Sequence, residues 1–99
     1  SSILRHVRRG RIRALHSVRD GAAEVIEAQT LATSPLVGKP LGQANLPPGV
    51  IVGAVLSDGK ISVPDGRHVL RDGDSVVIFA LRDAVAKVEK LFRVSIDYF

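Results

Sequence analysis

Short apolar stretches separated by Asp-Gly and Pro-Gly turns organise most of this sequence. Apolar and polar residues alternate over positions 11–18, and this period of two predicts a half-buried strand with one apolar face: Ile12, Ala14, His16 and Val18. Asp20-Gly21 follows and predicts a tight turn, since glycine tolerates a positive φ. We expect residues 22–31 to pair back as a second strand, with a bulge where the apolar pattern changes phase at Val25 and Ile26.

Two further stretches are apolar almost throughout. Residues 50–56 and 75–81 each predict a strand that is buried on both faces. Asp58-Gly59 predicts a turn from the first of these into a short strand at 60–63, and Asp72-Gly73 precedes the second. Asp83 is expected to cap a final helix whose apolar stripe comprises Ala84, Val85, Val88, Leu91 and Phe92.

The remaining segments predict small elements. A serine-capped helix is expected before Gly10, with Ile3, Leu4 and Val7 on one side and arginines on the other. Ser34-Pro35 predicts a helix or turn start, Pro40 opens another short helix, and residues 93–99 alternate as a short edge strand. This order of elements predicts an α+β domain with a small, mostly antiparallel sheet and short helices.

Composition narrows the class of protein. The chain has 99 residues, 45% of them hydrophobic and 24% charged, which fits one globular domain rather than a disordered polymer. It contains no Cys, which excludes disulfides and thiolate chemistry, and no Met even at position 1, which favours an excised piece of a longer protein. The longest apolar stretch, residues 50–56, is far shorter than the ~20 residues of a membrane-spanning helix, so no membrane insertion is expected.

Charge is concentrated at the N-terminus. The chain has a net charge of +4, and six Arg against one Asp give residues 1–20 a net charge of +5. Such a basic arm could bind nucleic acid, but no aromatic side chain lies within it to stack on bases, so a nucleic-acid partner is not expected.

The sequence lacks familiar catalytic and metal-binding patterns. It has neither a G-x-G-x-x-G nor a G-x-x-x-x-G-K-[ST] motif, and His6, His16 and His68 are too far apart along the chain to suggest a metal site. Asp72 and Asp74 could form an acid/base pair, but turn formation around Gly73 is the favoured interpretation. We therefore expect no catalytic residues, no metal and no enzyme.

Six sequence blocks carry a family resemblance. They are Gly21–Ala28 (GAAEVIEA), Ser34–Leu41 (SPLVGKPL), Asn45–Val50 (NLPPGV), Gly53–Gly59 (GAVLSDG), Ile61–Pro64 (ISVP) and Leu70–Phe79 (LRDGDSVVIF). In this order they closely resemble the TrkA C-terminal domain, which is the C-lobe of the RCK (regulator of K⁺ conductance) module, over residues 22–92. The resemblance implies an RCK C-lobe fold in residues 22–99, preceded in residues 1–21 by a helix and strand that link it to a nucleotide-binding domain.

The resemblance also implies a function. Members of this family are cytoplasmic proteins at the inner face of the membrane that regulate K⁺ transporter subunits. Their C-lobes form homodimers, and their Rossmann domain, which this chain lacks, binds NAD(H) or ATP. The expected function is thus a dimerising regulatory domain of a Trk-type K⁺ uptake protein. Alternatives are the same module on an anion or dicarboxylate transporter, and a small basic nucleic-acid-binding protein.

A small effector binds between C-lobes in some relatives. By position, its pocket would comprise Val52, Val55, Ser57, Asp58, Ile61 and Pro64. The alternative is that these six residues belong to an ordinary hairpin and core. Relatives that hold a phosphate-containing ligand such as cyclic di-AMP place basic groups at the end of this strand, whereas Ser57 and Asp58 stand here. Because a carboxylate repels phosphate, the resemblance leaves the effector unidentified.

Overall fold

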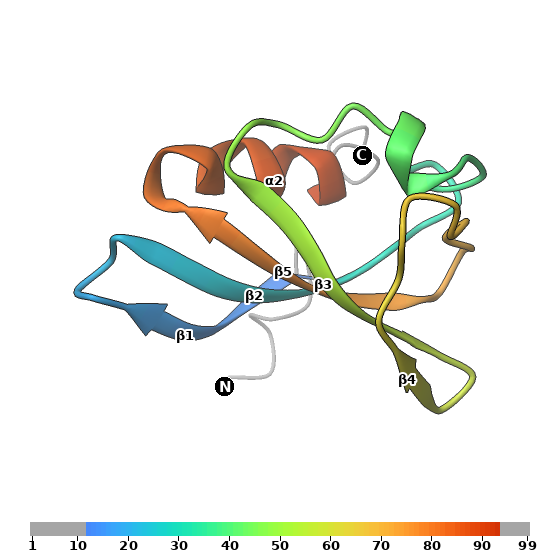
Figure 1. Ribbon diagram of the computed structural model, residues 1–99, viewed down its shortest axis with the longest axis horizontal. Coiled ribbons are helices and arrows are strands. Elements are labelled where there is room, and N and C mark those ends of the chain that lie inside the picture. The colour runs from blue at the N-terminus through green and yellow to red at the C-terminus, as the bar shows by residue number, and fades with distance from the viewer. Residues whose placement is uncertain (1–11, 94–99) are drawn as a thin grey trace, which may run out of the picture.

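Residues 12–93 of the computed structural model are described, and they form one antiparallel sheet covered on one side by a helix (Figure 1). The strands run in the spatial order β1-β2-β5-β3-β4. A 3₁₀ helix η1 lies between β2 and β3, and η2 leads directly from β5 into helix α2. The bounds are β1 Ile12–Val18, β2 Ala23–Gln29, η1 Leu41–Gln43, β3 Val50–Ser57, β4 Lys60–Ser62, β5 Ser75–Leu81, η2 Arg82–Ala84 and α2 Val85–Arg93.

The α+β class and the antiparallel sheet are confirmed. The strand order was not evident from the sequence, because β5, the last strand along the chain, lies between β2 and β3. Asp72-Gly73 therefore begins β5 without forming a hairpin. The expected helix before Gly10 lies outside the described residues. So does the strand expected over 93–99, apart from Arg93, which ends α2.

Two of the expected hairpin turns are present. Asp20 and Gly21 have φ values of 56° and 95° between β1 and β2, and Asp58 and Gly59 have φ values of 52° and 79° between β3 and β4. Positive φ at both central residues matches the right-handed twist of the strands they join, which explains the preference for Asp-Gly here.

The β1–β2 pair contains a bulge, but on the opposite strand from the one expected. The register shifts between Ala14 and His16 in β1, across from the phase change at Val25 and Ile26 in β2. Before the bulge, Ala14 pairs with the buried Ile26, so it faces the core; after it, His16 pairs with Val25 on the other side of the sheet. The prediction that positions 12 to 18 share one apolar face is therefore wrong beyond the bulge.

The core lies between the sheet and α2. Val76, Ile78 and Ala80 on β5 point into it, and Val88 and Phe92 of α2 cover them. The expected helical stripe is confirmed, since Ala84, Val88 and Phe92 are buried while Val85 and Leu91 pack partly buried against the core. Asp83 does not cap this helix, because it lies inside η2, whose N-cap position is Leu81.

Candidate functional site

The side of the sheet opposite α2 has no cover within the described residues, although it is rich in large apolar side chains. We call this side the outer face. Successive side chains of the central strand β5 point alternately to the core and to the outer face. Val76, Ile78 and Ala80 are buried in the core, whereas Phe79 and Leu81 on the outer face are 47% and 58% exposed. The large apolar residues exposed on the outer face are Leu15, Val18, Ile51, Leu56, Ile61, Phe79 and Leu81.

This exposure corrects the prediction that β3 and β5 are buried on both faces. Ile51 of β3 is 64% exposed, beside Phe79 of β5. A continuous apolar strand indicates that both of its faces are to be covered, but not which chain supplies the cover. Residues 12–93 of a single copy cover only one of the two faces.

Phe79 lies against Gly53 at the second bulge, where the β3 register shifts between Val52 and Ala54. A Cβ added at Gly53 would lie 2.3 Å from Phe79 Cε2, so any side chain there would displace the ring. Glycine at this position lets the Phe79 ring lie close to the β3 backbone in the middle of the outer face.

A small groove of about 270 Å³ opens on the outer face. It contains one carboxylate, that of Glu27, among mainly apolar side chains. The other lining residues are Leu15, Ala54, Val55, Leu56, Ile61, Ser75 and Val77. Of the six predicted effector residues, only Val55 and Ile61 line this groove. Leu15 and Val77 come from distant parts of the sequence, and only the strand order brings them here.

The other predicted effector residues point elsewhere or have structural partners. Val52 faces the core side of β3, paired with Ile78, and Pro64 is half-buried after β4. Ser57 Oγ donates a hydrogen bond to Asp74 Oδ1 at 2.8 Å. Asp58 occupies the turn, with its Oδ2 3.9 Å from Arg71 Nη2; both side chains are exposed, so the pair is weak. The six residues thus surround no single cavity, and their effector role stays a prediction.

Asp74 is the centre of a buried polar cluster. Besides the Ser57 hydroxyl, it accepts a hydrogen bond from the Arg71 backbone N–H at 3.1 Å on Oδ2. The buried Thr30 hydroxyl lies within hydrogen-bonding distance of the carbonyls of Arg71 (2.8 Å) and Asp74 (2.9 Å). Asp72 turns away and accepts from Ala32 N–H at 2.7 Å. The two carboxylates serve different turn contacts, which confirms the turn interpretation.

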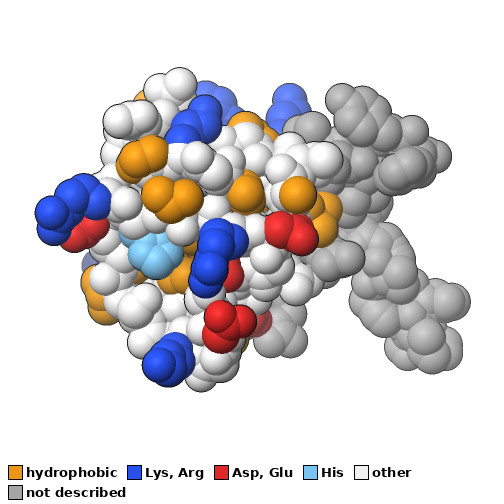
Figure 2. Space-filling view, turned by 90° about the vertical axis from the view of Figure 1, so that its right-hand side faces the viewer, with side chains coloured by type: hydrophobic (Ala, Val, Ile, Leu, Met, Phe, Trp, Pro, Cys, Tyr) orange, Lys and Arg blue, Asp and Glu red, His pale blue; other side chains and the backbone are white. Residues whose placement is uncertain are grey.

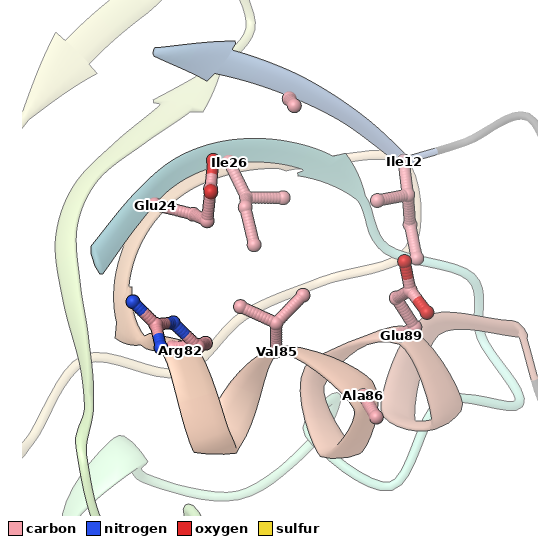
Figure 3. Close-up of a pocket in the computed structure, with 8 residues that line it drawn as sticks. Ile12, Glu24, Ile26, Arg82, Val85, Ala86 and Glu89 are labelled. Atoms are coloured by element: carbon pink, nitrogen blue, oxygen red, sulfur yellow. The ribbon is translucent and has the colours of Figure 1, made fainter. Parts of the chain in front are cut away.

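A larger groove of about 560 Å³ separates the β1–β2 hairpin from α2 (Figure 3). Its lining is apolar between two charged ends; Figure 3 shows Ile12 and Glu89 at one end and Glu24 and Arg82 at the other. The remaining lining residues are Ala14, Ile26, Val85 and Ala86. This groove was missed by the sequence analysis, since it forms only when η2 and α2 fold back over the hairpin.

The charged side chains on the described part of the chain form no single basic surface in the view of Figure 2, where basic and acidic groups are interspersed with apolar ones. No group of three or more His, Asp and Glu residues suited to a metal ion occurs among residues 12–93. Within the same described range, no helix is long and apolar enough to cross a bilayer.

Comparison with known families decides the assignment. The family model described as the TrkA-C domain matches residues 25–93. The chain belongs to the TrkA-C family. The Trk system potassium uptake protein TrkA of Azorhizobium caulinodans is 54% identical to it over 99 residues, which are 100% of this chain and 22% of that protein. The TrkA-C domain described here therefore spans about a fifth of the length of that curated relative.

Solved structures show the same fold. The RCK domain of GsuK superposes with a TM-score of 0.70 at 19% identity, covering 82% of this chain and 18% of that one. A structure described as the RCK_C domain dimer of S. agalactiae BusR in complex with c-di-AMP superposes with a TM-score of 0.60 at 25% identity, covering 69% of this chain and 93% of that one. The predicted RCK C-lobe architecture is confirmed for the described residues, while the predicted boundary at residue 21 stays a prediction.

Proposed function

We propose that this TrkA-C domain is a dimerising regulatory domain of a Trk-type potassium uptake protein at the cytoplasmic side of the membrane. It acts by binding, not by catalysis. A small effector favours one arrangement of two C-lobes, and this preference is passed to the transporter subunit. The whole-chain similarity to TrkA and the dimeric relative with a bound nucleotide support the proposal. Nicotinamide or adenine nucleotides would bind the preceding Rossmann domain of the full-length protein.

The outer face is the observation that carries the proposal. Burying large apolar side chains stabilises a complex by about 25 cal/mol per Å² before the costs of association, and a stable interface buries about 800 Å² on each partner. A second copy is the occupant we propose, because a twofold contact matches one apolar face with an identical one. The exposed Ile51 and Phe79 lie side by side near the centre of this face.

The dimer would also complete an effector site. The groove beside Ile61 is open on the outer face of one copy, and a second copy would close it. A ligand that contacts both copies stabilises only the dimer arrangement in which the groove is closed. Binding of the ligand therefore raises the population of that arrangement. The six predicted effector residues remain candidates for this role, and Ile61, which lines the groove, is 74% exposed.

Sedimentation velocity across a concentration series tests the dimer, and a thermal-shift panel tests the effector. The panel comprises cyclic di-AMP, ATP, NADH, K⁺ and Ca²⁺. A ligand at 100 times its Kd adds about 2.7 kcal/mol, which raises the Tm of a domain this size by roughly 10 °C or more. A concentration-independent monomer would reject the dimer proposal, and a panel without shifts would reject an effector among these compounds. Salt-dependent retention on DNA would instead favour the nucleic-acid alternative.

Replacing Gly53 by Ala should weaken the dimer more than it weakens the fold. The new methyl group would displace the Phe79 ring from the outer face, and that side chain is exposed enough to rotate away. We expect the dimer Kd to rise at least about tenfold, which corresponds to about 1.4 kcal/mol. The Tm should fall by only a few degrees, as expected for about 1 kcal/mol of rotamer strain.

Gly59→Ala is the control for this variant. The φ of Gly59 is 79°, which strains any side chain there, while a Cβ at that position meets no atom within 4 Å. It should lower the Tm and leave the Kd unchanged. Equal loss of dimer in both variants would contradict the role given to Gly53.

A further inference from the structure

The outer face has a second concave region, at the end of β5. We call it the Leu81 hollow; its volume is about 340 Å³, and no charged side chain among residues 12–93 lines it. Its lining consists of glycine and apolar residues, among them Ala23, Gly49, Ile51 and Leu81. Such a hollow suits an aliphatic group, because no charged or polar side chain is desolvated when the group enters.

Ile61 protrudes at the opposite end of the same face. It lies on β4 opposite Leu56 of β3, and Leu56 in turn pairs with Ser75, the first residue of β5. Leu81 is the last residue of β5, and Figure 1 shows β4 and the arrowhead of β5 at opposite ends of the sheet. The outer face therefore carries an exposed aliphatic side chain at one end of the central strand and an apolar hollow at the other.

We propose that Ile61 of each copy fills the Leu81 hollow of its partner in the outer-face dimer. In this register the two copies of β5 run antiparallel across the interface. A twofold axis that crosses the middle of β5 brings the start of the strand against the end of the partner's strand, so the contact forms twice. The inference rests on the proposed dimer and specifies how its two identical faces fit together.

The other simple twofold register brings like ends of β5 together. An axis along β5 sets the two hollows against each other and encloses an empty space, which is contrary to the close packing of stable interfaces. The antiparallel register instead places an aliphatic side chain in each hollow. It also buries both Ile61 and Leu81, which are exposed in the described part of one copy.

This register determines what closes the groove of about 270 Å³ beside Ile61. Ser75 and Val77 line that groove, so it lies toward the start of β5. The end of the partner's β5 lies over it when the two strands are antiparallel. A ligand in the groove therefore contacts the partner near Leu81, a residue that the sequence analysis did not place at the effector site.

Charge complementation tests the register. Ile61→Lys and Leu81→Glu each place a charge in both contacts of a homodimer, so each variant alone should dimerise at least about a hundredfold more weakly. Mixed in equal amounts, the two variants should form a heterodimer with one Lys–Glu contact and one unaltered contact. Its Kd should lie within about tenfold of that of the unsubstituted dimer, because an interfacial ion pair roughly replaces an apolar pair. Sedimentation velocity with a fluorophore on the Ile61→Lys chain measures the association.

Leu15→Glu is the matched control for Leu81→Glu. Leu15 is also exposed on the outer face, but it lines the groove beside Ile61 of its own copy and so lies at the end that does not meet the partner's Ile61. This variant should not recruit the labelled Ile61→Lys chain. The reversed pair, Ile61→Glu with Leu81→Lys, should associate as the first pair does. Both positions are exposed, so thermal unfolding of each variant should remain cooperative.

The outcomes separate the register from the dimer itself. Recruitment by Leu81→Glu and not by Leu15→Glu supports the register. Variants that are monomeric alone and stay monomeric when mixed would overturn the register and leave the outer-face dimer standing. So would equal recruitment by Leu15→Glu, or a reversed pair that does not associate. Single variants that dimerise with unchanged Kd would overturn both the register and the outer-face dimer.

Discussion

Phe79→Lys is expected to convert the proposed dimer into a monomer. Phe79 lies at the middle of the outer face on the central strand, and a twofold contact would place it in the interface twice. Loss of a central aromatic anchor costs about 2 kcal/mol, so two copies cost about 4 kcal/mol, or roughly a thousandfold in Kd. Because the ring is 47% exposed in one copy, the Tm of the monomer should fall by only about 5–10 °C. Sedimentation equilibrium gives the Kd.

Val69→Lys is the matched control for this variant. Val69 is 43% exposed, close to the value for Phe79, but it lies in the connection between β4 and β5 and is not on the outer face. The same introduced charge should therefore leave the dimer Kd unchanged. A Phe79→Lys protein that remains dimeric at micromolar concentration would show that copies meet through another surface.

Asp74→Ala is expected to cause the largest loss of fold stability among the polar substitutions. The substitution removes the acceptor for the Ser57 hydroxyl and the Arg71 N–H, in a residue only 7% exposed. Hydrogen bonds to a charged group contribute about 1.5–3 kcal/mol each, and water can replace only part of this loss. We expect a loss of about 3 kcal/mol, which lowers the Tm by roughly 12–24 °C. Thermal unfolding followed by circular dichroism measures it.

Asp72→Ala provides the comparison, because the two aspartates flank the same glycine. Asp72 is exposed and accepts one backbone hydrogen bond, from Ala32. Its loss should cost no more than about 1 kcal/mol. The loss of stability in Ser57→Ala should also be about 1 kcal/mol. The loss in Asp74→Asn should lie between those of Asp72→Ala and Asp74→Ala, since the asparagine amide retains one acceptor oxygen. If Asp72→Ala and Asp74→Ala were equally destabilising, the buried cluster would not be what stabilises this turn.

Local features of the fold could be predicted because short-range chemistry determines them. The Asp20-Gly21 and Asp58-Gly59 turns require positive φ, and these residue types allow it. The apolar stripe of α2 follows from the helical period, and Val88 and Phe92 are buried as that period indicates. The family blocks added the C-lobe assignment, which pattern alone would have left at the level of an α+β domain.

Features that depend on which strands meet could not be predicted. The phase change at Val25 indicated a bulge, but the extra residue could lie in either strand of the pair, and β1 carries it. The hydroxyl of Ser57 was assigned to an effector, since nothing local reveals that Asp74 comes within 2.8 Å of it. Both grooves are lined by residues far apart in sequence, so neither could be seen before the strand order was known.

The position of β5 between β2 and β3 governs how this chain can be synthesised and folded. β2 and β3 each pair with β5 and not with each other, so the sheet consists of two separate hairpins until the last strand joins them. A ribosome making this domain from its N-terminus can complete the β1–β2 and β3–β4 hairpins early, but isolated two-stranded hairpins are marginally stable in water. Cooperative folding must await the emergence of residues 75–93, and these non-local pairings place it among the slower small domains. A nascent chain halted before residue 75 should thus remain sensitive to protease.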